Sequence, residues 1–415
     1  MSGRLALKAV NAFCLLALFV VPLCWSIVTP VFGSVPWPNR VVDYKLIHEF
    51  SHMVATEHVY PPIFPYPPSA VCLLTPFHMF SFSSTAMIWL IASALCTSGV
   101  FVLGSELVGL EKHPLRWAIS LLAMVSVGYF VVTDLRATNC NMIYLFLLTA
   151  GITCLERGRS KGGSLLLAMS ISLKIYSVAV VGYLIARGDW RNALRTIGWV
   201  AFLWIVPPLA IFGLDGSIAV YRSWGDQIAR LMLGAEHYDF INLTSLRKGL
   251  FAALGPEQAS AMLLVCRVMW GLLVAATLAL TAALSSLKRS GEQWDWALGT
   301  GVMALALGAT SPFLEVYHFV PAALINLALL SIAFGSREPA WIRTMAMASV
   351  VLAWGILKFG PKGAERGISL YLYAVVMASC VVAVWSTRLI RLRSVEASKE
   401  EPIIVPLSRE WSRAA

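Results

Sequence analysis

An acidic residue, Asp43, opens a polar stretch that follows the first apolar run of the chain. Residues 43–57 place Leu46, Ile47 and Phe50 at helical spacing, which predicts a short amphipathic helix lying in a membrane interface. A carboxylate at the start of such a helix, facing water, can take a proton from a hydroxyl group as a general base. The same carboxylate can simply cap the helix, and the sequence leaves both roles open.

The predicted helix also matches the zinc-protease motif HExxH. His48 and His52 lie one helical turn apart, where two imidazoles can bind zinc, and Glu49 takes the place of the general base. Asp215 offers a third ligand but lacks the Asn-Pro context that intramembrane metalloproteases show. Because so short a motif also matches by chance, histidines on the polar face of an interfacial helix are the simpler interpretation.

Lys174 lies within a long apolar stretch that has arginine-rich loops on both flanks. Two basic flanks on one side of the membrane predict a hairpin of two short helices, with Lys174 near the external apex. A lysine at membrane depth is costly and is therefore a candidate functional residue, whose natural ligand there is a phosphate. Snorkelling of the amine to the lipid headgroups is the alternative.

Further polar side chains lie in the connections between apolar runs. Side-chain amides can hydrogen-bond a sugar, and arginine can bind a phosphate. The proline-rich tract 60–68 cannot be regular helix, so it is expected to be a rigid connector that returns the chain to the membrane. The candidates in these connections are Tyr66, Asn139, Asn141, Asn242, Arg247, Glu315 and His318.

The composition requires that membrane helices position these residues. Of the 415 residues, 58% are hydrophobic and only 13% are charged, which excludes a disordered protein, a coiled coil and an ordinary soluble enzyme. Apolar runs near the bilayer-spanning length of roughly 20 residues recur between Ala9 and Ile390. They predict an all-α polytopic membrane protein with about twelve transmembrane helices. The cysteines form no CxxC pair and no disulfide framework.

Basic residues predict the orientation of these helices. Most of the 32 Lys and Arg residues fall near the N-terminus, in alternate loops and after residue 387. The positive-inside rule therefore puts both termini in the cytoplasm and the long loops 33–68 and 214–258 on the external face of the plasma (inner) membrane. The short segment 69–80 is expected to be re-entrant or strongly tilted. The net charge of +10 is thus an insertion signal that also favours anionic membrane lipids, and it predicts no nucleic-acid partner.

The order of these motifs along the chain resembles glycosyltransferase family 87, the polyprenyl-phosphate-mannose-dependent mannosyltransferases and their relatives. Two departures are Thr138-Asn139-Cys140 where the family usually has Gly-Gln before the Asn, and Ile after the lysine where it has Pro. The matching features are Asp43 in the first external loop, Y-x-x-x-F-x-Y-P-P at 60–68, Asn141 at the start of a span, the intramembrane Lys174, N-x-T-S-L at 242–246 and S-P-x-x-x-x-x-H ending at His318.

The resemblance implies the GT-C fold and inverting transfer of a sugar, with mannose favoured, from a polyprenyl-phosphate donor to a glycolipid or glycan acceptor on the external face. By motif position, Asp43 is the general base, His318 assists in the donor or acceptor site, and Lys174 and Arg247 hold the lipid phosphate. Some relatives in the superfamily also use a divalent metal near their acidic loop, so the resemblance allows one here. The expected substrate-binding residues are Tyr66, Asn139, Asn141, Asn242 and Glu315.

The expected architecture is a single GT-C-like transmembrane domain over residues 1–393, followed by a cytoplasmic tail over 394–415. A zinc-dependent intramembrane protease using His48, Glu49 and His52 stays open as the alternative function. A transporter is disfavoured, because its binding charges should lie near the midplane of two repeated halves. Here the unusual residues gather on one face, and no repeat is evident.

Overall fold

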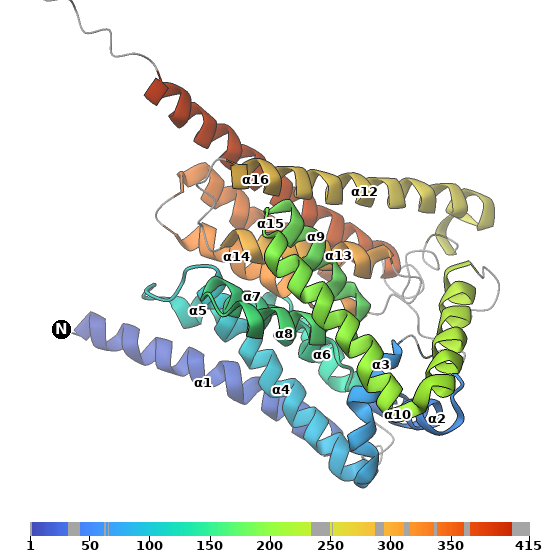
Figure 1. The fold of residues 1–415 in the computed structure, drawn as a ribbon. Coiled ribbons are helices and arrows are strands. Elements are labelled where there is room, and N and C mark those ends of the chain that lie inside the picture. The colour runs from blue at the N-terminus through green and yellow to red at the C-terminus, as the bar shows by residue number, and fades with distance from the viewer. Residues whose placement is uncertain are drawn as a thin grey trace, which may run out of the picture.

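The computed structural model describes residues 2–31, 42–61, 64, 66–233, 250, 252–286, 294–310, 316–335, 338–360 and 366–400. Over these residues the chain is helical and contains no strand (Figure 1). The N-terminal half contains α1 (Ser2–Val31), α2 (Val42–Glu57), α3 (Pro68–Leu74), η2 (Thr75–Met79), α4 (Phe82–Leu107), α5 (Arg116–Ser126), α6 (Gly128–Ala137), α7 (Asn141–Glu156), α8 (Ser160–Leu173), η3 (Ile175–Val178) and α9 (Ala179–Ala186). The C-terminal half contains α10 (Trp190–Leu233), α12 (Pro256–Ser286), α13 (Trp294–Thr310), η4 (Val316–Phe319), α14 (Ala322–Phe334), α15 (Ala340–Phe359) and α16 (Arg366–Glu400).

Six of these helices are long and apolar enough to cross a membrane, which confirms a polytopic membrane protein. They are α1, α4, α10, α12, α15 and α16. The apolar run near 117–132, one of those that suggested a span, is divided into α5 and α6, which meet at an angle of 67°. Val127 lies outside helical geometry at this joint, with φ −105° and ψ 9°, and Gly128 follows it. Since several other apolar helices are shorter than a bilayer, the count of about twelve spans is not confirmed.

The apolar interior surrounds α14, in which every residue from Ala322 to Ala333 is buried. A helix that is hydrophobic on all sides belongs in the centre of a bundle, and α13, α15, α5 and α4 pack around it. By contrast, α1, α10 and α12 expose large apolar side chains such as Phe13, Ile205 and Leu264. In a membrane protein, such outward-facing apolar surface is what contacts lipid.

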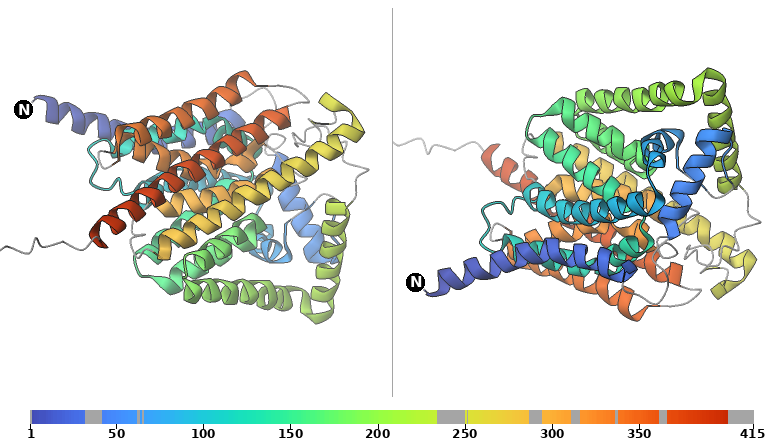
Figure 2. Two further views of the ribbon diagram at one scale, coloured as in Figure 1. Left: turned by 90° about the horizontal axis from the view of Figure 1, so that it is seen from above. Right: turned by 90° about the horizontal axis from the view of Figure 1, so that it is seen from below.

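The first polar segment folds as predicted over residues 43–57, where α2 forms. It lies at one end of the bundle, beside α3 and the start of α4 (Figures 1 and 2). The following segment forms only the seven-residue α3 and the 3₁₀ turn η2. Neither is counted among the candidate spans, in line with the prediction that 69–80 does not cross the membrane fully. The position of α2 relative to a bilayer stays a prediction.

The second polar segment differs from the extended loop that the sequence suggested. Helix α10 continues past its membrane-length part and bends at Gly213, whose φ of 68° and ψ of −177° are not helical. The part after the bend, 214–233, forms an arm that runs in a new direction at the same end of the bundle as α2 (Figure 1). Only glycine adopts this backbone conformation readily. The arm is therefore a direct consequence of one residue.

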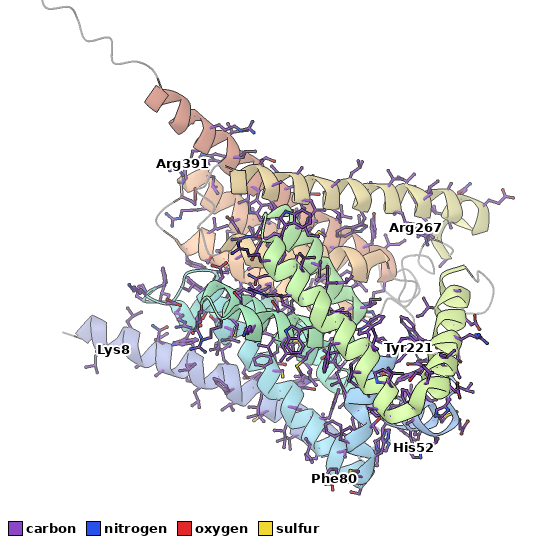
Figure 3. All side chains as sticks on the ribbon, in the orientation of Figure 1. Lys8, His52, Phe80, Tyr221, Arg267 and Arg391 are labelled. Atoms are coloured by element: carbon purple, nitrogen blue, oxygen red, sulfur yellow. The ribbon has the colours of Figure 1, made fainter. Side chains whose placement is uncertain are left out.

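The start of the first helix and the end of the last helix lie at the same end of the bundle. Helix α1 begins, and α16 ends, at the end opposite to α2 (Figures 1 and 2). Lys8 and Arg391 mark that end, whereas His52 and Phe80 mark the other (Figure 3). Helix α16 continues beyond residue 393 to Glu400, so the expected tail begins as helix, and residues 401–415 lie outside the described part of the chain.

Candidate functional site

Helix α2 carries Asp43 in its first turn and is fixed by aromatic packing. The next residue, Tyr44, is buried with its ring 5.8 Å from Phe82 and 5.4 Å from Trp89, both on α4. Ile47 and Val54 are buried in the same apolar cluster. Packing on one face of α2 therefore determines where the Asp43 carboxylate points.

Asp43 accepts a hydrogen bond of 2.7 Å at Oδ2 from the side-chain amide of Asn139. Asn139 stands in the turn that joins α6 to α7, directly after Thr138, which has left-handed dihedral angles of 59° and 39°. Tyr66, from the proline-rich connector, donates to Asn139 Oδ1 at 3.3 Å. Three segments far apart in the sequence thus meet at one carboxylate.

Asp134 lies behind this turn and is fully buried. Its carboxylate accepts hydrogen bonds from Asn141 Nδ2 at 2.7 Å and from the backbone N–H of Met142 at 3.2 Å. It therefore satisfies a backbone donor at the start of α7, as a capping residue does. An Asp shortly before an apolar helical run is also a recognisable capping signal in the sequence.

Lys174 ends α8 in an extended conformation, with φ −148° and ψ 114°. Its amine donates to Asn141 Oδ1 and lies 5.8 Å from the centre of the Tyr144 ring. Ser170, one turn earlier, donates to the backbone carbonyl of Tyr144 at 2.8 Å and so fastens α8 to α7. With only 8% of its surface exposed, Lys174 points into the bundle and does not snorkel to the headgroups. The predicted break between two short helices at this residue is confirmed.

The structure thus joins five of the predicted site residues through hydrogen bonds. We call this group, together with Asp134, the Asp43 network. His318 is buried on η4, which packs against α6, and the neighbouring Phe319 stacks on Phe130 of α6 with ring centres 5.6 Å apart. Asn242, Arg247 and Glu315 lie outside the described residues. The members of the network are Asp43, Tyr66, Asp134, Asn139, Asn141 and Lys174.

The two histidines of the HExxH match meet a third one, which the sequence analysis did not single out. The ring of His78, on η2, is centred 5.1 Å from His48 and 5.1 Å from His52, and its Nε2 is 2.9 Å from Ser51 Oγ. Burial, together with the neighbouring His48 and His52, lowers the pKa of His78 to about 4. Burial also lowers the pKa of His48, and His52 adds to this shift. These two rings are therefore neutral at pH 7.

A metal centre is not formed by these residues. Within the described part of the chain, no group of three or more His, Cys, Asp or Glu side chains is arranged to hold a metal ion. His78 has no signal in the sequence pattern, because only the tertiary fold brings η2 to α2. Nothing in the structure supports the zinc-protease alternative.

A helical bundle with several membrane-length helices is a polytopic membrane protein, and its candidate site lies at one end of the bundle. The family model of glycosyltransferase family 87 matches residues 64–312, more than half of the chain. The chain therefore belongs to this family and is a membrane glycosyltransferase. Membership of the GT-C superfamily fits this assignment. No curated protein and no solved structure matches the chain.

The matched range contains most of the Asp43 network but excludes Asp43 and His318 themselves. Tyr66, Asn139 and Lys174 lie inside it. The hydrogen bond from Asn139 to Asp43 is therefore the contact that connects the family's matched region to the carboxylate on α2.

Proposed function

We propose that this glycosyltransferase moves a sugar, with mannose favoured, from a polyprenyl-phosphate donor to a glycolipid or glycan acceptor. The observation that carries the proposal is the 2.7 Å hydrogen bond between Asn139 and Asp43, because it places a donor on this carboxylate from within the range that the family model matches. An amide donor stabilises a carboxylate in its charged form. A charged carboxylate at the edge of a buried polar site is suited to act as a general base.

In the proposed reaction, Asp43 takes the proton of the acceptor hydroxyl while the hydroxyl oxygen attacks the anomeric carbon of the donor sugar. The bond from that carbon to the phosphate oxygen breaks on the opposite face, and polyprenyl phosphate leaves with the bonding electron pair. A single displacement of this kind inverts the anomeric carbon, so one carboxylate is enough. A phosphate leaving group stabilised by cations needs no strong general acid.

Other residues have supporting roles in the proposal. Lys174 is a buried cation connected to Asp43 through two asparagines, which supports its assignment to the donor phosphate. Arg247 is assigned to the same phosphate and His318 to the donor or acceptor site. Substrate binding by Tyr66, Asn139, Asn141, Asn242 and Glu315 stays a prediction, as does any use of a divalent metal.

We further propose that the Asp43 network faces the exterior or periplasm from the inner membrane, with both termini in the cytoplasm. Lys8 and Arg391 lie at the end of the bundle opposite to the network, which supports this orientation (Figure 3). Basic residues concentrate on the cytoplasmic side of membrane proteins. In this orientation a lipid-linked sugar donor reaches the site from the outer leaflet.

The proposal is tested by the exchange Asp43→Asn, which keeps the size of the side chain and removes its basicity. Purified protein in nanodiscs is incubated with radiolabelled polyprenyl-phosphate mannose and a membrane lipid extract. We expect transfer to fall by at least about 100-fold, the usual contribution of a general base. Folding is checked by circular dichroism and by elution in gel filtration.

Asp215→Asn is the matched control, because Asp215 is an exposed carboxylate on the α10 arm. It should leave transfer unchanged, and it also removes the third ligand that the protease alternative would need. Full activity of Asp43→Asn would disprove the base assignment. A wild-type protein that moves no label from any polyprenyl-phosphate sugar would disprove the donor class.

A further inference from the structure

The direction of the hydrogen bonds behind Asp43 is set by the chemistry of its neighbours. Asn139 Oδ1 accepts from three donors: the backbone N–H of Cys140 at 2.7 Å, Asn141 Nδ2 at 3.0 Å and the Tyr66 hydroxyl at 3.3 Å. Turning this amide over would place its NH₂ group against all three donors. The Asn139 amide is therefore held with Nδ2 toward Asp43.

The side-chain amide of Asn141, which donates to Asn139, also has a fixed orientation. Lys174 can only donate, so Asn141 must present its oxygen to the lysine. The NH₂ group of Asn141 consequently faces the other way and donates to Asp134 Oδ1 and to Asn139 Oδ1. The lysine at the inner end thus fixes the orientation of two amides.

Burial makes this arrangement costly to change. Asp134 and Asn141 are fully buried, and Asn139 exposes only 5% of its surface. A buried polar group that loses its hydrogen bond is left desolvated and unsatisfied. The network therefore has one satisfied arrangement, in which Asp43 receives an N–H donor.

We propose that Asn139 is a positioning residue that orients Asp43 and keeps it ionised, and that Lys174 fixes the direction of the amides behind it. This inference rests on the proposed function, since it assigns a task to Asp43. For Asn139 it replaces the predicted contact with the sugar by a partner in the protein, the Asp43 carboxylate. Among the described charged groups, Lys174 favours the ionised form of Asp43, and a charged Asp134 opposes it.

The first test is the isosteric exchange Asn139→Asp, which replaces the donor facing Asp43 with an acceptor. Two carboxyl groups at this distance cannot both ionise easily, so they share a proton and the apparent pKa of the pair rises. The acid limb of the pH profile of kcat/KM should move upward by about one pH unit or more. An acid limb at the wild-type position in an active variant overturns the proposal.

Asn326→Asp is the matched control. Asn326 is also buried and donates from Nδ2 to Ser126 Oγ at 2.8 Å, but it lies in α14, outside the Asp43 network. The exchange brings the same buried carboxyl group and the same general risk to folding. It should leave the acid limb of the pH profile where it is in the wild type.

A second variant, Asn139→Ala, separates positioning from substrate binding. Loss of a hydrogen bond to a charged group should lower kcat by about tenfold to 100-fold. The KM values for donor and acceptor should stay within about threefold, because a positioning residue does not contact either substrate. A raised KM with unchanged kcat would show that Asn139 binds substrate, and would overturn the proposal.

An infrared titration gives a readout that needs no activity. The carbonyl band of protonated Asp43 is identified by its absence in Asp43→Asn. In Asn139→Ala this band should appear at a higher pH than in the wild type, because the donor that favours the ionised carboxylate is gone. An unchanged midpoint overturns the positioning role even if transfer is normal. A shifted midpoint in a protein that transfers no sugar would instead retain the positioning role and reject the proposed function.

Discussion

The two ends of α4 show two different ways of placing charge in a membrane protein. At its C-terminal end, Glu106 bonds Arg116 at 3.3 Å and also pairs with Arg157. About half of the Arg157 side chain is exposed, whereas the Arg116 and Glu106 side chains expose 16% and 19%. At its N-terminal end, α4 supports α2 through Tyr44, and the members of the network behind Asp43 are buried.

The difference indicates where function resides. An ion pair with an exposed partner such as Arg157 contributes little and tolerates change, because water already solvates that partner. A buried charge must recover its lost hydration from well-placed partners, and apolar residues could often fill the same space at no cost in stability. The ion pairs of Glu106 with Arg116 and Arg157 therefore serve to join α4, α5 and the end of α7. The Asp43 network, which stability alone does not require, is the candidate for chemistry.

The largest effect is expected from removing the buried cation of the Asp43 network. Lys174→Met leaves Asn141 Oδ1 without this donor and Asp134 without the attraction of its neighbouring cation. We expect transfer to fall at least about 100-fold and the free energy of unfolding to fall by about 3 kcal/mol. Transfer assays and thermal unfolding in detergent measure both.

Arg157→Met is the matched exchange at the other end of α4. It should lower the free energy of unfolding by less than about 1 kcal/mol and leave transfer within about twofold of the wild type, since Arg157 is half exposed. Equal losses of transfer and of unfolding free energy in Lys174→Met and Arg157→Met would contradict the distinction between the Asp43 network and the Glu106 ion pairs.

An intermediate effect is expected at the bend of α10. Gly213→Ala meets no atom within 4 Å, so its only penalty is a backbone conformation that L residues avoid. That penalty should lower the free energy of unfolding by about 2 kcal/mol. Gly198→Ala, in the straight part of the same helix and also in open space, should be neutral or stabilising. A melting temperature for Gly213→Ala at or above that of Gly198→Ala would contradict this view of the bend.

The smallest effect concerns pH at the α2 end. The pKa of His78 in the folded protein, about 4, lies below its usual value of about 6.5, so the unfolded chain binds the proton first on acidification. The contribution to stability is complete above pH 6.5 and is lost as the pH falls toward 4. Because water screens these rings, we expect a loss of about 1 kcal/mol.

Thermal unfolding between pH 7.5 and pH 4.5 measures this loss. The variant His78→Phe keeps a ring beside His48 but cannot be protonated, so its stability should fall less steeply on acidification. An equally steep fall would assign the acid sensitivity to other groups.

Much of this organisation follows from local sequence signals. The spacing of apolar residues predicts α2, and the order of polar residues predicts that Asp43, Tyr66, Asn139, Asn141 and Lys174 belong to one site. The basic loops around Lys174 predict the break between α8 and α9. These signals work because each one depends on a nearby stretch of chain or on a motif order.

Other features depend on tertiary packing and could not be predicted. Apolar periodicity does not reveal the bend at Val127, because the residues on both sides suit one continuous helix. The meeting of His78 with His48 requires the fold of η2 against α2. The hydrogen bond between Asp134 and the Asn141 side chain likewise requires the turn that joins α6 to α7. The helix after Gly213 was missed because its polar residues are also typical of a loop.

The arm of α10 binds the segment after α2, which the ribosome makes much earlier. The backbone N–H of Tyr60, just after α2, donates to Ser223 Oγ on that arm at 2.9 Å, across 163 positions of the chain. At roughly 5 to 20 residues per second, a ribosome needs on the order of ten to thirty seconds to make the intervening chain. During that interval the segment that bears Asp43 lacks this partner. In the nascent enzyme, the packing of Tyr44 on α4 can therefore form before the contact with the arm.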